Sequence, residues 1–439
     1  MKSDKKLKIY QKSKDIVTKR IKESLETNNI NTSKFLKVIQ KNYINAKSHN
    51  YKINTEKIET TNSIPSIERT IINLLENKNT INHMKNADIN VDELHNVIQN
   101  NNLPNYMNSF NDSYKIMILY HFIDKYNTEN IERKKCYSSF VPVEIQHYSE
   151  KNHNYIHRIF CDKIGLNITI LSSNDISKIN WVDTLIYRII TMKLLFKFTE
   201  NIHIRILDTP FKKKINYFKT AQRVLGPREI NSGFTTSGTN EIVIFRSEEI
   251  LKVILHEMLH MFKIDSKINF NDSITNSVLE ILHISDSSWV RPSEAIIELI
   301  ANLYNSVFVT LEQNLTHNDF LKFIYTDGTH SIIQASRVLK YIGIQYNNNL
   351  IITPNADKIQ RTSAISYYVI RASLYWCLGK IVKDLDLLKS YKKDYKINYD
   401  KYKNNIIKCL QNKNLMGKNG IIQTIPFHLI GNTLRMTVV

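Results

Sequence analysis

Glycine, proline and cysteine are scarce in this chain of 439 residues, which contains 10 glycines, 8 prolines and 4 cysteines. Glycine and proline are the main residues of tight turns, so their scarcity favours a helix-rich fold over one built from many short strands. The four cysteines form no CxxC pair; they are Cys136, Cys161, Cys377 and Cys409. The sequence therefore predicts neither a cysteine zinc site nor a disulfide framework, which is typical of proteins in a reducing compartment.

The chain also lacks a long, uninterrupted apolar segment. Residues 1–8 are polar and basic, so no signal peptide is expected there. The longest apolar stretch, residues 184–198, is interrupted by Arg188, Lys193 and Lys197. It is too short and too charged to cross a bilayer. We therefore expect a cytoplasmic protein without membrane insertion, located in the host cytoplasm or the virion if the source is a virus.

Positive charge, by contrast, is abundant. There are 60 Lys and Arg residues against 41 Asp and Glu residues, which gives a formal net charge of +19. Such a balance favours contact with nucleic acid or acidic surfaces. The lysines are spread along the chain without a nucleic-acid motif, and the densest basic run, residues 211–219, is expected to be a solvated loop. Nonspecific polyanion binding is therefore expected as a general property of the surface.

The amino-acid composition and the pattern of apolar residues change near residue 140. Residues 1–140 are polar and rich in Lys, Asn and Ile, and helical patterns occur at 65–77 and 91–100. They predict a helical N-terminal region whose role the sequence does not indicate.

The second expected domain comprises residues 141–439. A long helix is predicted at 180–200, and strands are predicted at 166–171, 202–207 and 241–245. The fold class that follows is α+β and mainly helical, with a sheet lobe at about 141–265 and a helical C-terminal lobe at about 266–439.

The most informative motif is the HExxH pattern His256-Glu257-Met258-Leu259-His260. Positions i and i+4 share one face of a helix, so two imidazoles placed there can hold one Zn²⁺. Glu257 is then near the metal without being forced to ligate it, and can take a proton from a water that attacks a carbonyl. The alternative is a surface helix with two solvated histidines.

The flanking residues support a helix at the motif. Ser247 is the expected N-cap, and Glu248 and Glu249 place negative charge in the first turn. The apolar residues of 250–262, except Val253, cluster on one side of the helix, and the two histidines of the motif lie on the other.

The third metal ligand decides the class of enzyme. A metzincin has Gly and His at the positions that Lys263 and Ser266 occupy here, so that class is excluded. Glu294 is the strongest ligand candidate, and Glu298, one helical turn later, can support a ligand histidine through a hydrogen bond. Glu298 and Asp265 stay open as alternative ligands, and two solvated glutamates are the alternative to a site.

This combination resembles the gluzincin group of zinc metallopeptidases, which carry HExxH on one helix and a glutamate on a second helix downstream. The resemblance implies a zincin-like fold with one catalytic Zn²⁺ bound by His256, His260 and Glu294, a water in the fourth position, and Glu257 as general base. It also implies that residues 241–246 form an edge strand that accepts an extended peptide.

A second resemblance, carried by residues 231–234, 241–246 and 256–265, is to uncharacterised metallopeptidase-like proteins of large DNA viruses. It carries no activity with it. For stabilising an oxyanion the sequence offers only His283 and the pair Tyr367-Tyr368 as candidates.

The predicted function is a zinc-dependent endopeptidase that acts on a protein or peptide substrate. One alternative is a non-catalytic interaction protein on a zincin scaffold, with a basic surface that binds polyanions. Another is a zinc hydrolase that acts on a non-peptide bond.

Overall fold

The computed structural model describes residues 2–57, 135–138, 140–215, 224–236, 238–267, 272–284, 289–347, 350–352, 360–425 and 433–438. The chain divides into two compact units, of which one combines residues 1–56 with 138–439 and the other comprises 57–137. The helical patterns expected at 65–77 and 91–100 lie outside the described residues. The first unit thus takes in residues 1–56, which were expected to belong to the N-terminal region of residues 1–140.

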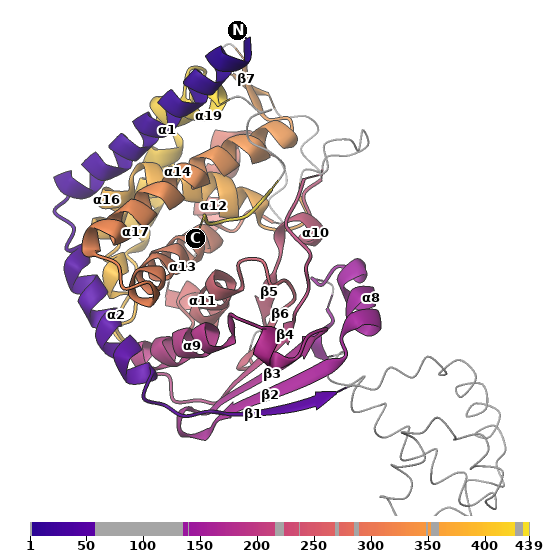
Figure 1. The fold of residues 1–439 in the computed structure, drawn as a ribbon. Coiled ribbons are helices and arrows are strands. Elements are labelled where there is room, and N and C mark those ends of the chain that lie inside the picture. The colour runs from indigo at the N-terminus through magenta and orange to yellow at the C-terminus, as the bar shows by residue number, and fades with distance from the viewer. Residues whose placement is uncertain are drawn as a thin grey trace, which may run out of the picture. The chain divides into compact units, whose positions relative to one another are not determined.

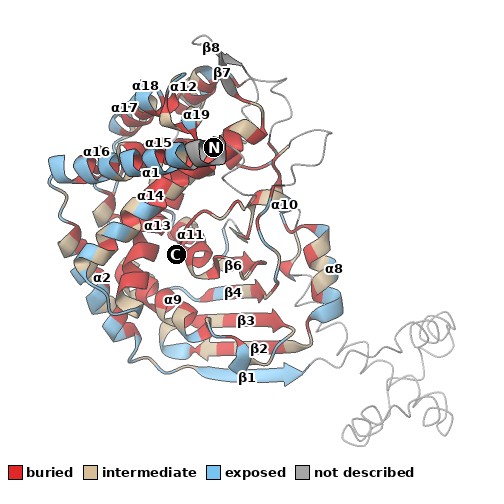
Figure 2. Ribbon diagram, turned by 45° about the horizontal axis from the view of Figure 1, so that its top comes forward, coloured by how far each residue is buried: buried red, intermediate tan, exposed pale blue. Residues whose placement is uncertain are grey.

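A mixed sheet of six strands forms one side of the first unit (Figure 1). The strands lie in the order β1-β2-β3-β4-β6-β5. β3, β4 and β6 are parallel, while β2 and β5 run antiparallel to their neighbours β3 and β6. β1, at one edge, is exposed along its length, whereas β3 is mostly buried (Figure 2). The strand bounds are β1 Lys52–Lys57, β2 Tyr155–Cys161, β3 Leu166–Ser172, β4 Ile202–Leu207, β5 Gly233–Thr235 and β6 Glu241–Ile244.

The edge strand beside the HExxH helix is β5, so the expectation that residues 241–246 form that edge is wrong. β6 lies between β4 and β5. The turn-rich residues before β6 fold back as a hairpin, in which Gly238 has a φ of 78° and Thr236 N donates to Glu241 O at 3.1 Å. The hairpin adds β5 outside β6 and covers its edge.

Helices make up the rest of the unit (Figure 1). Their bounds are α1 Lys2–Thr27, α2 Thr32–Ala46, α8 Val143–Asn152, α9 Val182–Phe196, α10 Pro227–Ile230, α11 Ile250–Met261, α12 Asp272–Leu282, α13 Pro292–Glu312, α14 His317–Tyr341, α15 Arg371–Trp376, α16 Leu378–Asp384, α17 Tyr399–Leu410, α18 Lys413–Met416 and α19 Ile421–Thr424. A π-helical segment, η6 Ile365–Ile370, precedes α15, and a short hairpin joins β7 Gln345–Asn347 to β8 Leu350–Ile352. Four short 3₁₀ turns complete the described elements: η2 Asp162–Ile164, η3 Ile176–Lys178, η4 Asp265–Lys267 and η7 Leu387–Lys389.

The helix α13 lies at the centre of the helical side and packs against α11, α14, α15 and η6. It is long and apolar enough to span a membrane by composition, but 94% of its most apolar window is buried inside the protein. A helix surrounded by other helices is apolar on all sides, so burial in the core accounts for its composition. α1 and α2 cover the outside of this layer, α1 against α14 and α16, and α2 against α9.

The prediction of a mainly helical fold with a small sheet is confirmed. The strands expected at 166–171 and 202–207 are β3 and β4. The helix expected at 180–200 is shorter, because α9 ends where Lys197 adopts a left-handed conformation with a φ of 53°.

Two expectations about single residues were wrong. Cys377 and Cys409 form a disulfide that links the start of α16 to α17, although no sequence pattern indicated one. The residues are 32 apart in sequence, so only the packing of their helices brings them together. Lys213, in the basic run expected to be solvated, is buried beside Glu249.

Candidate metal centre

The HExxH motif lies on α11, which is buried between the sheet and α13. The helix begins two residues later than expected, because its N-cap is Glu249 in a left-handed conformation (φ 62°) and not Ser247. Glu249 is fixed there by its buried side chain. Its carboxylate lies 3.2 Å from Lys213 Nζ and accepts the backbone N–H groups of Met436 and Thr437 at 2.7 and 2.8 Å.

Three donor atoms from two helices meet at one point. His256 Nε2 and His260 Nε2 on α11 lie 3.1 Å apart. Glu294 Oε2, in the first turn of α13, lies 3.4 Å from the first of these nitrogens and 3.2 Å from the second. Among the described residues, these three side chains form a group that could hold a metal ion.

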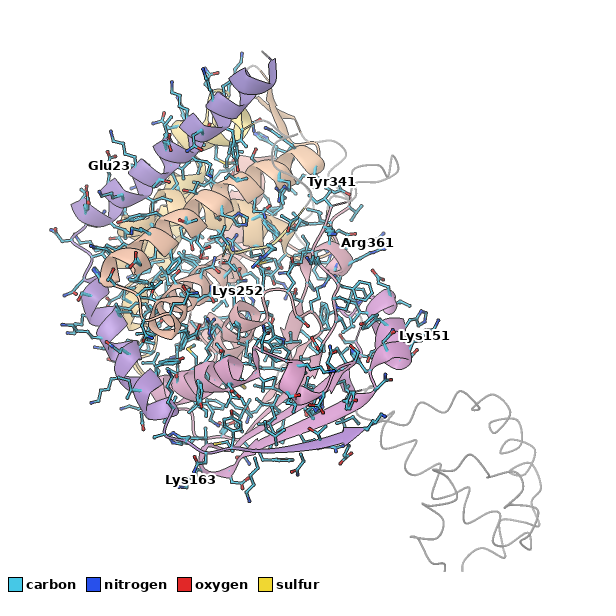
Figure 3. The ribbon with its side chains drawn as sticks, in the orientation of Figure 1. Glu23, Lys151, Lys163, Lys252, Tyr341 and Arg361 are labelled. Atoms are coloured by element: carbon cyan, nitrogen blue, oxygen red, sulfur yellow. A yellow bond between two sulfur atoms is a disulfide. The ribbon has the colours of Figure 1, made fainter. Side chains whose placement is uncertain are left out.

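Behind His256 lies a second carboxylate. Glu298 Oε2 is 2.8 Å from His256 Nδ1, on the side of the ring that faces away from the donor cluster. Glu298 Oε1 forms ion pairs with Lys252 and with Arg371 Nη1, the latter at 2.9 Å. All four side chains are buried, and Figure 3 shows Lys252 in the interior of the unit. Two buried cations therefore balance the charge of Glu298 and hold it against the ring.

Behind His260 lies Asp265. Its Oδ2 is 3.2 Å from His260 Nδ1, while Glu294 occupies the Nε2 side of the same ring. The structure thus places Asp265 as a partner of the ring's other nitrogen and outside the three-atom cluster. Both histidines have a carboxylate at Nδ1 and the shared donor cluster at Nε2.

The charges in this cluster shift one another's pKa values. Burial alone would raise the pKa of Glu294 and of Glu298, but the neighbouring cationic groups more than offset it and hold both pKa values below the usual range. Burial would likewise lower the pKa values of His256 and His260, yet the carboxylates beside them raise both. The protein alone therefore favours protonated histidines beside ionised glutamates. A divalent cation would replace those protons as the balancing charge.

The candidate base, Glu257, points to the side of α11 covered by β5. Thr235 Oγ1 donates to Glu257 Oε2 at 2.8 Å and lies 2.9 Å from the carbonyl oxygen of the same residue. The side chain of Glu257 lines the same cleft as His256, His260 and Glu294. That cleft has a volume of about 690 Å³.

Of the three oxyanion candidates, the structure brings only Tyr367 to the cleft. Its ring centroid lies 5.8 Å from that of His256. Burial, together with the nearby charges of Glu294, Glu257 and Glu298, raises its pKa well above the usual value, so the phenol keeps its proton. Tyr368 points away and donates to Leu434 O at 2.6 Å. His283 is exposed and does not line the cleft.

Lys252, Arg371 and Thr235 also belong to the site and were not predicted from the sequence. Lys252 precedes His256 by four residues, so its place on the histidine face of α11 was open to inference. Arg371 and Thr235 reach the site from distant parts of the chain, and no local pattern marks them.

Comparisons with known proteins give one relationship. The chain is similar to an uncharacterised protein of Acanthamoeba polyphaga mimivirus, with 28% identity over 208 residues that cover 42% of this chain and 50% of the relative. The chain thus spans about half the length of that curated relative. No protein-family model matches the chain, and no solved structure matches it. The comparisons therefore relate the chain to a viral protein.

Proposed function

We propose that this protein is a zinc-dependent endopeptidase with a zincin-like active site. The observation that carries the proposal is the spacing of three donor atoms. Ligands about 2.0–2.1 Å from a tetrahedral zinc ion lie about 3.3–3.4 Å from one another. The distances among His256 Nε2, His260 Nε2 and Glu294 Oε2 are 3.1, 3.2 and 3.4 Å.

The carboxylates behind the two rings support the same ligand set. Glu298 and Asp265 each face an Nδ1 atom, and a carboxylate there favours the tautomer with its proton on Nδ1. The lone pair of each Nε2 is then free for a cation. His256, His260 and Glu294 would hold the zinc, and a tetrahedral site keeps its fourth position for water or substrate.

The protein supplies a base and an acid to a peptide bond in the cleft. When bound, zinc would polarise the carbonyl and make a water more acidic. Glu257 accepts a proton from the attacking water and passes it to the leaving nitrogen. The hydrogen bond from Thr235 fixes one oxygen of that carboxylate and leaves the other for the proton transfer. Tyr367, protonated at neutral pH, is the group we assign to stabilise the developing oxyanion.

The edge strand β5 supplies a surface for an extended substrate. Phe245 N donates to Ser232 O at 2.9 Å, so Ser232 and Phe245 form a hydrogen-bonded pair. From this pair, hydrogen-bonded and non-hydrogen-bonded pairs alternate along the β5–β6 register. The N–H and C=O groups of Gly233 and Thr235 therefore point away from β6, toward the open edge. A peptide strand can pair with these groups next to Glu257.

The viral relative supports a viral source, and with it a place of action in the host cytoplasm or the virion. The net charge of +19 favours a second candidate, an interaction protein that keeps the scaffold and binds polyanions without catalysis. A general base held by its own hydrogen bond, as Glu257 is, favours the peptidase over this alternative.

The deciding experiment measures zinc and turnover together. Wild type should contain one zinc per chain and cleave members of a mixed peptide library, and His256→Ala should lose both properties. Glu257→Gln should keep the zinc and lose turnover by roughly 10²–10⁴-fold. Zinc without cleavage in wild type would favour the interaction protein, and cleavage of esters alone would favour a non-peptide hydrolase. Equal zinc in wild type and His256→Ala would reject the site.

A further inference from the structure

We propose that Phe140 and Phe234 form a subsite that selects an aromatic side chain on the substrate residue next to the cleaved bond. This inference rests on the proposed peptidase function, because it takes the substrate to lie along β5. It adds a class of preferred substrate, an extended peptide with Phe, Tyr or Trp at one position.

The two faces of β5 differ in what they present. Thr235 Oγ1 contacts Glu257, and a Cβ added at Gly233 would lie 3.2 Å from Val253 Cγ1 and 3.4 Å from Glu257 Cγ. Both positions therefore face α11. Because successive side chains of a strand point to opposite faces, Phe234 faces away from α11.

On that opposite face Phe234 meets Phe140, which lies just before α8. The two ring centroids are 6.0 Å apart and the rings are tilted by 38°. Phe140 is 39% exposed, and Phe234 is half-buried. Both rings line the cleft that contains His256, His260 and Glu294. An aromatic surface thus lies open at the wall of the cleft.

Strand geometry brings one substrate residue to this surface. On a strand added at the open edge of β5, the residue opposite Phe234 belongs to a non-hydrogen-bonded pair, in which antiparallel Cα atoms are only about 4.5 Å apart. Its side chain falls on the same face as Phe234. The residues before and after it turn their side chains toward α11, the helix of the metal cluster. The substrate residue opposite Phe234 is therefore adjacent in sequence to the substrate residue that faces the metal cluster.

An aromatic ring is the side chain that fits this position best. It can pack on two rings at once, and aromatic pairs prefer centroid spacings of about 4.5–7 Å, as the two phenylalanines already show. A small or charged side chain at the same position would leave both rings exposed to water.

Binding can be measured without turnover by using Glu257→Gln as the parent protein. The probes are fluorescently labelled octapeptides of Ala, Ser and Thr in which one Phe is moved along the sequence. We expect one position of Phe to tighten binding roughly 10-fold or more, the range for a large apolar contact. Phe140→Ala in the same parent should remove that gain, and Phe140→Tyr should keep it.

Val143→Ala is the matched control, since Val143 lies close by in sequence, is 60% exposed and is absent from the cleft wall. Equal binding of all peptides, or an unchanged Phe preference in Phe140→Ala, would overturn the subsite. Phe-selective binding with no cleavage by wild type would reject the peptidase and leave the subsite standing. Cleavage by wild type without a Phe preference would support the peptidase and overturn the subsite. If Phe140→Ala fails to fold by circular dichroism, Phe140→Ser and Phe234→Leu take its place under the same criteria.

Discussion

His256 and His260 project from the same face of α11, but their supporting carboxylates lie in different surroundings. Glu298, behind His256, has 1% of its side chain exposed and is balanced by Lys252 and Arg371. Asp265, behind His260, has 40% of its side chain exposed and follows the end of α11. We call these two arrangements the deep side and the rim side of the site.

The difference shows how one cluster of side chains can be joined both to the core and to solvent. On the deep side, charges without water must balance one another, so removing one leaves the others uncompensated. On the rim side, water can take the place of a missing partner. The deep side should therefore set the stability of the fold as well as the position of a ligand, and the rim side should affect the ligand alone.

The largest expected effect is on the deep side. Glu298→Ala leaves Lys252 and Arg371 buried without their shared carboxylate, so we expect the free energy of unfolding to fall by about 3–5 kcal/mol. Asp265→Ala should lower it by less than about 1 kcal/mol. Urea unfolding of the metal-free proteins, followed by circular dichroism, measures both values. Similar losses in the two variants would remove the distinction between deep and rim sides.

A buried carboxylate that accepts hydrogen bonds from neutral donors sharpens the comparison. Asp327 on α14 is as buried as Glu298, but accepts hydrogen bonds from the neutral donors Thr437 Oγ1 and Val438 N. Burial raises its pKa from 3.8 to about 6. The folded protein therefore holds a proton that the unfolded chain releases between these values, so this contribution to stability is present below about pH 4 and lost as the pH rises through 6.

The shift of about two pKa units corresponds to roughly 3 kcal/mol. Asp327→Asn should remove this pH dependence, so the variant should gain up to that amount relative to wild type between pH 4 and pH 7. Unfolding curves at several pH values test it. A constant difference between the two proteins across this range would contradict the prediction.

Substitutions on the deep side and the rim side should also differ in how much they lower zinc affinity, but by a smaller free energy than in the preceding predictions. Supporting carboxylates typically change metal affinity roughly 10–100-fold. We expect Glu298→Gln near the upper end of that range and Asp265→Asn near the lower end, because water can replace the exposed carboxylate. Glu294→Ala should exceed both, since it removes a donor atom. Competition with a chelator gives the order, and a larger loss in Asp265→Asn than in Glu298→Gln would reverse our assignment.

The smallest predicted effect concerns the base. Thr235→Val removes the hydroxyl that holds Glu257 while keeping the shape of the side chain. We expect kcat to fall about 10-fold with little change in KM, as for loss of a hydrogen bond of about 1.5 kcal/mol to a charged group. Thr235→Ser should restore most of kcat. A rise in KM alone, or no rescue by serine, would assign Thr235 to substrate binding or packing.

Local patterns were enough to predict which side chains share a helix face at the candidate metal site. The four-residue spacings of His256 with His260, and of Glu294 with Glu298, each place two side chains on one helix face. The structure brings these faces together, with Glu298 at the Nδ1 side of His256. The helix period alone determines which side chains share a face, and this does not depend on the surrounding tertiary structure.

Features that depend on distant contacts were not predictable. Arg371 comes to Glu298 from 73 residues away, and Thr235 comes to Glu257 from 22 residues away. The start of α11 was misplaced for the same reason. Its N-cap, Glu249, is held in place by Lys213 and by two backbone N–H groups near residue 436. A capping rule that considers only neighbouring residues does not include these partners.

The contact between Glu249 and residues 436–437 has a consequence for the order of events at the ribosome. The first backbone donor that holds Glu249, the N-cap residue of α11, belongs to Met436, which is 187 residues later in the chain. At translation rates of about 5–20 residues per second, roughly 10–40 s pass between the synthesis of Glu249 and the synthesis of Met436. The cleft is therefore completed only after residues 436 and 437 have been synthesised.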